Sequence, residues 1–138
     1  MARILIIDDE KGIRKFLTMV LDESGHVLSS SSSLLEGIGV CEREEFDIVL
    51  LDVNLPDGNG LEVLPRIQNS VGRPEVIIIT GDGDPDGAEL AIKSGAWDYI
   101  EKPFSLEFVK WKVKNALITR QELKEKYSKI ITTEPQEI

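Results

Sequence analysis

The stretch DIVLLDVNLPDGNG, residues 47–60, places four apolar residues before a single carboxylate, Asp52, and then turns to a segment rich in Gly, Pro and Asn. A short apolar run bounded by turn residues is typical of a strand buried on both faces of a parallel sheet. Asp52 then stands at the carboxyl end of that strand, which is the edge where open α/β sheets bind ligands. We therefore interpret the rest of the chain by what it brings to Asp52.

Apolar runs and helical patterns alternate on both sides of this stretch. Short buried strands are expected at 4–7, 27–28, 48–51, 76–79 and 99–100, each followed by apolar residues at helical spacing. Strand then helix, repeated in this way, predicts a parallel sheet with right-handed crossovers and helices on both faces. Five such units in about 120 residues fit the α/β class and its flavodoxin-like doubly wound (βα)5 fold, with strand order 2-1-3-4-5.

Composition limits the class of protein. The 138 residues suit one domain with a single core, and the formal net charge of −9 argues against nucleic-acid binding by this segment itself. No apolar run approaches the roughly 18 residues of a membrane helix, and no secretory signal follows Met1. Cys41 is the one cysteine and has no partner for an internal disulfide. Together these features favour the cytoplasm.

Four local segments carry expectations of their own. We interpret Ser29–Ser33 as a polar loop that ends in a helix N-cap, and Ser105 as the N-cap of the last helix. Pro65 falls inside the third helical pattern, so a late helix start or a kink is expected there. The segment Gly81–Gly87 is rich in helix breakers and is expected to be mobile.

The residues just past the strand ends form a chemically coherent set: Asp8 and Asp9, Asp52, Thr80, and Lys102. Parallel strands bring these ends to one edge, where three carboxylates repel one another unless something compensates. Mg²⁺ takes carboxylate and carbonyl oxygens and leaves room for a phosphate oxygen, and a lysine adds a compact positive charge. The set predicts phosphoryl transfer to Asp52 as the nucleophile. Taken singly, each residue also fits a solvated loop or a strand end, so the joint placement carries the prediction.

Four segments resemble the receiver domain of bacterial two-component response regulators: LIIDDE (5–10), VLLDVNLPDGNG (49–60), IIITGDGD (77–84) and GAWDYIEKPF (95–104). They occur in the family's order, and the resemblance covers about residues 3 to 118, within a receiver domain that we place at 1–120. It implies that Asp52 accepts a phosphoryl group from a sensor histidine kinase. It also implies a Mg²⁺ site formed by Asp8, Asp9, Asp52 and the backbone carbonyl of Asn54.

The same resemblance implies roles for other residues. Lys102 would pair with the phosphoryl group, ahead of Pro103, which is typically a cis-proline in the family. Thr80 and Tyr99 match the switch pair, in which the hydroxyl moves toward the phosphate and the ring turns inward. No external substrate is expected, because such domains catalyse only their own phosphorylation and dephosphorylation. Asp82, two residues after Thr80, either helps to orient the hydrolytic water, which predicts a moderately short-lived phosphoryl group, or is a solvated loop acid.

Two segments, ITGDGD (79–84) and DYIEKPF (98–104), are similar to the NtrC-like branch of the family. Members of that branch activate sigma-54 transcription through an AAA+ domain. The resemblance therefore implies an AAA+ and DNA-binding output domain in a longer parent chain, with a single-domain regulator as the alternative.

The last helix carries two apolar stripes. Phe108, Trp111 and Ile118 lie on the side away from the sheet, which suggests a partner surface unless they cover residues of the same domain. The second stripe has heptad spacing and consists of Val109, Val113, Ala116, Arg120, Leu123, Tyr127 and Ile130. Because we expect little of the domain to be left to pack on beyond about residue 118, we hypothesise a linker helix within 121–138 that pairs with its copy in a homodimer. Arg120 weakens that seam, and the tail from Thr132 is expected to fray.

Three other functions share the fold. A phosphatase with an aspartate nucleophile normally needs a second aspartate two residues later, where Asn54 stands. A flavin-binding electron carrier needs Ser- and Thr-rich loops after the first strand, where Asp8-Asp9-Glu10 stands. A protein-interaction module that is no longer phosphorylated would be expected to lack part of the acidic and basic set, and none of it is missing. The site rather than the fold separates these alternatives.

Overall fold

The computed structural model describes residues 1–81 and 85–133. The strands of its main sheet are β1 (Arg3–Ile7), β2 (Val27–Ser31), β3 (Ile48–Asp52), β6 (Glu75–Thr80) and β7 (Asp98–Glu101). A small hairpin is formed by β4 (Asn54–Leu55) and β5 (Gly58–Asn59). The helices are α1 (Lys11–Glu23), α2 (Leu34–Arg43), α3 (Gly60–Gln68), α4 (Pro85–Lys93) and α5 (Leu106–Thr133).

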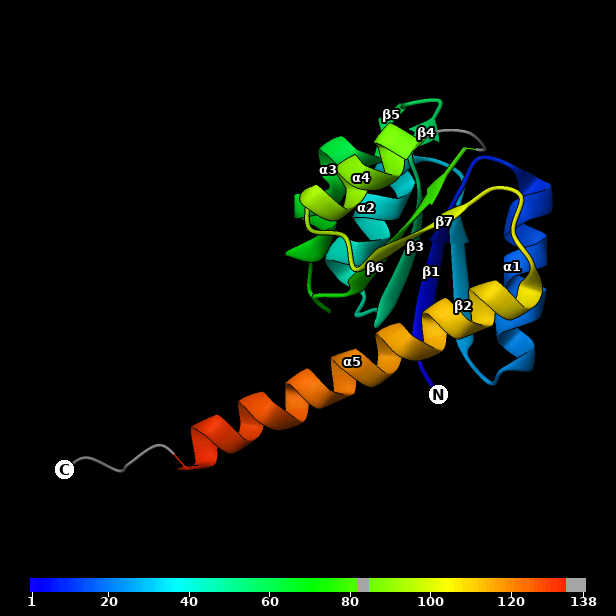
Figure 1. The fold of residues 1–138 in the computed structure, drawn as a ribbon. Helices are drawn as coiled ribbons and strands as arrows, with labels where there is room; N and C mark the ends of the chain where they lie inside the picture. Colours follow the sequence, from blue (N-terminus) through cyan, green and yellow to red (C-terminus); the bar gives the residue numbers. More distant parts are fainter. Residues whose placement is uncertain (82–84, 134–138) are drawn as a thin grey trace.

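The main sheet is parallel, with strand order β2-β1-β3-β6-β7 (Figure 1). Counted along the chain, its strands follow the order 2-1-3-4-5, so the predicted flavodoxin-like fold is confirmed. Strand β3 lies at the centre, between β1 and β6, and Asp52 is its last residue. The fold therefore places Asp52 in the middle of the carboxyl edge.

Helices cover both faces of the sheet. The core on one face is formed with α2, α3 and α4, and the core on the other with α1 and α5 (Figure 1). Strand β1 shows why both are needed, because Leu5 and Ile7 point into the first core and Ile4 and Ile6 into the second. A strand that is apolar on both sides must be buried on both sides. Over the part of the chain that the structure describes, none of the helices combines the length and the apolar character needed to cross a lipid bilayer.

The serine segment differs in part from the prediction. Ser29–Ser31 belong to β2 and are paired with β1, so the expected loop is wrong for these residues. Backbone pairing with β1 decides their conformation, whatever their side chains prefer in isolation. Ser33 does cap α2, since its hydroxyl accepts a hydrogen bond from the Glu36 N–H at 3.2 Å.

The third helix starts earlier than Pro65 suggested. It begins at Gly60, where the Asn59 side chain accepts a hydrogen bond from the Leu61 N–H at 2.8 Å, so the expected late start is wrong. Burial of Leu64 and Ile67 on either side of the proline offsets the backbone hydrogen bond that it cannot make. The predicted cap at Ser105 is confirmed by a 3.2 Å hydrogen bond from the Phe108 N–H.

Two expectations fall partly or wholly outside the described residues. Asp82 lies there, and so does the middle of the segment expected to be mobile. The helix α5 continues through residue 120 without a break and includes Thr132 and Thr133, while the rest of the tail expected to fray is outside the described residues.

The single cysteine provides a test of core packing. Cys41 is 1% exposed, and burial raises the pKa of its thiol to about 11. Because the thiolate is the reactive form, we expect thiol–disulfide exchange at Cys41 of the folded protein at pH 8 to be on the order of 100-fold slower than in urea. The measurement is the rate of reaction with a chromogenic disulfide reagent in buffer and in denaturant. Similar rates in the two solutions would contradict this packing.

Candidate phosphorylation site

Three carboxylates meet at the carboxyl edge of the sheet. Oxygen atoms of Asp8, Asp9 and Asp52 all lie within 4.8 Å of one another. The parallel register of β1 and β3 pairs Ile7 with Leu51, so the acids that follow these residues emerge side by side. Asp8 and Asp52 are buried, whereas Asp9 is exposed. The grouping expected from the strand ends is therefore present.

Lys102 reaches into this cluster from the loop after β7. Its Nζ lies 3.3 Å from Asp8 Oδ2 and 3.5 Å from Asp52 Oδ2. It also lies 3.3 Å from Glu10 Oε1, a contact that the sequence did not predict. The peptide bond between Lys102 and Pro103 is cis, as the family resemblance implied. The lysine thus contacts acids from two strand ends and from the start of α1.

The electrostatics of the cluster are dominated by burial. Burial, and then the negative charge of Asp8, raise the pKa of Asp52 to about 6, although Lys102 opposes this. Burial also raises the pKa of Asp8. Burial by itself would lower the pKa of Lys102, but the charges of Asp52 and Asp8 outweigh it and the pKa is raised. One lysine therefore faces more negative charge than it neutralises, which is a setting that favours an added cation.

Two buried oxygen atoms support the same interpretation. Asp8 Oδ2 and Thr80 Oγ1 have no hydrogen-bond partner among residues 1–81 and 85–133. Asp8 Oδ2 is instead balanced by the ion pair with Lys102 Nζ at 3.3 Å. A buried polar atom without a partner is costly unless something else satisfies it. Carboxylate oxygens with unused bonding capacity are the ligands that a hard divalent cation takes, so these residues fit a magnesium ion.

The hairpin that follows Asp52 returns the chain to it. The Asn54 N–H donates a hydrogen bond to Asp52 Oδ1 at 3.3 Å, and Asn54 pairs with Asn59 across the hairpin. At Gly60, a Cβ atom would lie 2.4 Å from the backbone oxygen of Asp52. Only glycine therefore allows α3 to begin this close to the phosphoacceptor candidate.

Thr80 and Tyr99 lie on the neighbouring strands β6 and β7. Thr80 is fully buried and pairs with Glu101, while Tyr99 is half-buried and pairs with Ile78. Tyr99 packs against the core on the α2, α3 and α4 side. The two residues predicted as a switch pair thus lie near the same edge of the sheet. Tyr99 stands two residues before Glu101, the residue paired with Thr80.

The two predicted apolar stripes of α5 differ in exposure, because the first is at the surface whereas Val109, Val113 and Ala116 of the second are buried in the core. Phe108, Trp111 and Ile118 are 43%, 58% and 46% exposed, and the rings of Phe108 and Trp111 stack with centroids 6.3 Å apart. A second group, hereafter the extension stripe, consists of Leu123, Tyr127 and Ile130, which are 56%, 67% and 56% exposed. Both groups leave large apolar side chains in contact with solvent.

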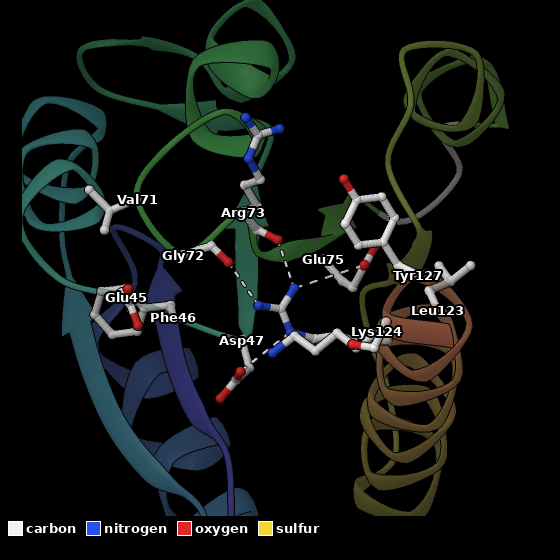
Figure 2. Close-up of a pocket in the computed structure, with 12 residues that line it drawn as sticks. Glu45, Phe46, Asp47, Val71, Gly72, Arg73, Glu75, Leu123, Lys124 and Tyr127 are labelled. Carbon is white, nitrogen blue, oxygen red and sulfur yellow. Dashed lines mark hydrogen bonds and ion pairs between the residues drawn. The ribbon is translucent and has the colours of Figure 1, made fainter. Parts of the chain in front are cut away.

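The contacts of Arg120 correct the prediction that this residue belongs to a heptad seam between two helices. Its guanidinium donates hydrogen bonds to the carbonyl oxygens of Arg73 at 2.7 Å and Gly72 at 2.8 Å, and it pairs with Asp47 Oδ1 at 3.3 Å. Figure 2 shows these three partners on the side of the pocket opposite Tyr127. The domain therefore still contacts α5 beyond residue 118, and Arg120 binds it. Two of the partners are backbone carbonyls, which no residue pattern reveals.

Comparisons with known proteins agree with this fold. The family described as the response regulator receiver domain matches residues 4–114. A doubly wound sheet with an acidic cluster at its carboxyl edge fits a signalling domain of this class, and this chain belongs to the response regulator receiver domain family.

Two curated relatives show the extent of the match. The chain is 36% identical over 118 residues to the response regulator protein PilR of Pseudomonas aeruginosa, which covers 86% of this chain and 26% of PilR. It is 32% identical over 115 residues to sporulation initiation phosphotransferase F of Bacillus subtilis, which covers 83% of this chain and 93% of that protein. The chain thus spans about a quarter of PilR but nearly all of the second relative.

Solved structures give the same result. The beryllofluoride-activated NtrC4 receiver domain dimer has a TM-score of 0.81 and 36% identity, covering 87% of this chain and 99% of that chain. NtrX from Brucella abortus in complex with ADP has a TM-score of 0.84 and 31% identity, covering 92% of this chain and 29% of that chain. The predicted likeness to NtrC-like receivers is therefore confirmed.

Proposed function

We propose that this chain is a phosphorylation-activated switch in which Asp52 accepts a phosphoryl group from a sensor histidine kinase. A carboxylate oxygen of Asp52 forms a bond to phosphorus as the phosphorus–nitrogen bond of the phosphohistidine breaks, and the leaving imidazole keeps the electron pair and takes up a proton. The observation that carries the proposal is the cluster of Asp8, Asp9 and Asp52 oxygens within 4.8 Å, with Lys102 Nζ 3.5 Å from Asp52.

Asp8, Asp9, Asp52 and the backbone carbonyl of Asn54 would hold Mg²⁺, which supplies positive charge for the incoming phosphoryl oxygens. Lys102, already within reach of Asp52, would pair with one of those oxygens after transfer. Hydrolysis would return Asp52 to its free carboxylate, because water attacks phosphorus, the bond between phosphorus and the Asp52 oxygen breaks, and inorganic phosphate is released.

Thr80 and Tyr99 would convert this chemistry into a change of shape. The Thr80 hydroxyl is buried and has no hydrogen-bond partner in the described part of the chain, so it is free to donate to a phosphoryl oxygen. Movement of Thr80 would leave room for the half-buried ring of Tyr99 to turn inward. A switch of this kind works by biasing two states that already coexist.

The chemical proposal is tested by incubating residues 1–138 with Mg²⁺ and acetyl phosphate, or with beryllium fluoride as a phosphoryl mimic. We expect a mass gain of one phosphoryl group with acetyl phosphate and a change in tryptophan fluorescence with either reagent. Chelation of Mg²⁺ beforehand should suppress both signals. No mass gain and no fluorescence change under any of these conditions would favour the non-phosphorylated interaction module.

We propose that the output of the switch is the control of transcription and that the protein acts in the cytoplasm. Similarity to PilR and NtrX, of which this chain matches only about a quarter, supports an AAA+ and DNA-binding output domain in a longer parent chain. The net charge of −9 supports placing any DNA contact outside residues 1–138.

A homodimer formed through the extension stripe is also proposed. Helix α5 runs beyond the sheet (Figure 1), and a pocket of about 700 Å³ lies between its end and the domain. Figure 2 shows Leu123 and Tyr127 on the helix side of this pocket and Val71 and Phe46 on the domain side. The second helix of a pair would cover the stripe and part of this pocket.

Light scattering at high protein concentration tests the homodimer. We expect the double variant Leu123→Ser, Tyr127→Ser to weaken dimerisation at least ~10-fold, because it removes most of the buried apolar area. The matched control is Glu125→Ser, Lys129→Ser, which alters the opposite helical face and leaves the net charge unchanged. A monomer for the unaltered chain, with and without beryllium fluoride, would contradict the homodimer.

A further inference from the structure

Asp57 connects the hairpin after Asp52 to a distant helix. It lies in the turn between β4 and β5, and its two carboxylate oxygens accept hydrogen bonds from the backbone N–H groups of Leu34 at 3.0 Å and Leu35 at 2.9 Å. These are the first residues of α2, whose N–H groups have no partner within the helix. Ser33 caps α2 locally at Glu36. The start of α2 is therefore held both by its own chain and by the hairpin.

Packing keeps the hairpin on α2. A Cβ atom at Gly58 would lie 3.2 Å from Leu34 Cδ1, which shows how closely the turn approaches this helix. Gly58 also has a φ of +150°, a value that side-chain-bearing residues rarely adopt. Leu55 is 8% exposed and belongs to the core that includes α2 and α3. The tip of the hairpin is thus fixed by apolar contact as well as by Asp57.

The other end of the hairpin contacts the phosphorylation site. Asn54 pairs with Asn59 across the two strands and donates its N–H to Asp52. The chain then closes back on this segment through the Gly60 N–H, which donates to the Val53 carbonyl at 2.7 Å. Between the carboxylate of Asp52 and the start of α2 there is consequently one short, doubly anchored hairpin.

We propose that Asp57 is a positioning residue for the cation site: by holding the hairpin on the start of α2, it fixes the backbone of Asn54 for cation binding and couples cation occupancy to α2. This inference rests on the cation site of the proposed function. Asp57 contacts neither the cation nor the phosphoryl group, so it acts only through the hairpin.

The coupling has two measurable consequences. Without Asp57 the hairpin samples more positions, and cation binding must order it; residues that support metal ligands in this way commonly change affinity by about 10-fold or more. We expect Asp57→Ala to weaken Mg²⁺ binding by about 5- to 20-fold. Because coupling is reciprocal, bound Mg²⁺ should also slow hydrogen exchange of the Leu34 and Leu35 N–H groups in the unaltered chain.

Calorimetric titration with MgCl₂ and amide hydrogen exchange by NMR test both consequences. The matched control is Glu62→Ala, which removes one exposed carboxylate from the first turn of α3. Asp57→Asn keeps one acceptor oxygen and should fall between the unaltered chain and Asp57→Ala, and it replaces the alanine variant if that one does not fold. Support requires that the Asp57 variants weaken Mg²⁺ binding by more than Glu62→Ala does.

Three outcomes would overturn the inference. Equal weakening by Glu62→Ala would reduce the effect to long-range charge. Faster exchange at Leu34 and Leu35 with unchanged Mg²⁺ affinity would leave Asp57 as a helix cap alone. Absence of Mg²⁺ binding by the unaltered chain would overturn the cation site itself, and this inference with it. The first two results, in contrast, would overturn the role of Asp57 and leave the cation site standing.

Discussion

Asp52→Asn is expected to abolish phosphorylation by acetyl phosphate and, in the absence of metal, to make the fold more stable. The variant lacks the nucleophilic carboxylate, so it should show no mass gain. Its stability should rise because Asp52 is 5% exposed and its ionised form is disfavoured by burial and by Asp8. Loss of function with a gain in stability is characteristic of a site that assembles like charges for chemistry.

The pH dependence of this stability gain follows from the raised pKa. Asp52 has a folded-state pKa of about 6 against an ordinary value of 3.8, so the folded state favours the protonated form. Below about pH 4 the carboxyl is neutral in both states and contributes no penalty. Between about pH 4 and about pH 6 the carboxyl ionises more readily in the unfolded state, so the free-energy penalty on the folded state grows with pH. Above about pH 6 this penalty reaches about 3 kcal/mol.

Urea denaturation in the presence of a chelator, at several pH values from 3.5 upward, measures the difference in free energy of unfolding between Asp52→Asn and the unaltered chain. We expect this difference to reach about 3 kcal/mol at high pH. The matched control is Asp9→Asn, which removes a charge from the same cluster at an exposed position and keeps the nucleophile. It should change stability much less, and because Asp9 is a proposed Mg²⁺ ligand this variant is a control for stability only. A phosphorylated Asp52→Asn variant, or one less stable than the unaltered chain at neutral pH without metal, would contradict the assignment.

Arg120→Ala is expected to destabilise the fold by about 2 to 4 kcal/mol. The side chain is 11% exposed, and its removal takes the Arg120 donor from the carbonyls of Gly72 and Arg73 and from Asp47 Oδ1. The loop has little freedom to move and compensate. A Cβ atom at Gly72 would lie 2.6 Å from the backbone of Phe46, so the two segments already touch.

Two further variants make this test specific. Arg120→Lys keeps the charge but lacks the planar fork that reaches both carbonyls, so it should recover only part of the lost stability. Lys124→Ala, on the exposed surface of the same helix, should have little effect. Urea denaturation gives the free energies of unfolding, and hydrogen exchange along α5 should be faster after residue 116 in Arg120→Ala. Equal stability of Arg120→Ala and Lys124→Ala would exclude an anchoring role.

The strand ends were predictable because their placement follows from chain order alone. Once the strands are parallel, the residues after β1 and β3 must emerge at the same edge, whatever packs around them. Asp8, Asp9 and Asp52 therefore come together as expected. Thr80 and Lys102 follow for the same reason, from the ends of β6 and β7.

Local preference was a weaker guide where tertiary contacts opposed it. Ser29–Ser31 have side chains that favour turns, but pairing with β1 holds them in a strand. Pro65 disfavours a helix interior, but buried neighbours on both sides and the Asn59 cap keep α3 continuous. In both cases packing outweighs a propensity worth a few kcal/mol at most.

The sequence by itself determined the fold class, the acidic edge and the exposed stripes of α5, because each follows from periodicity or from the direction of parallel strands. Only the tertiary structure decided that Glu10 shares Lys102, that Asp57 holds the start of α2, and that Arg120 binds the domain instead of weakening a helix seam. The physical reason is common to Asp57 and Arg120. Their partners are mainly backbone N–H and C=O groups, which every residue carries and which only folding brings within reach.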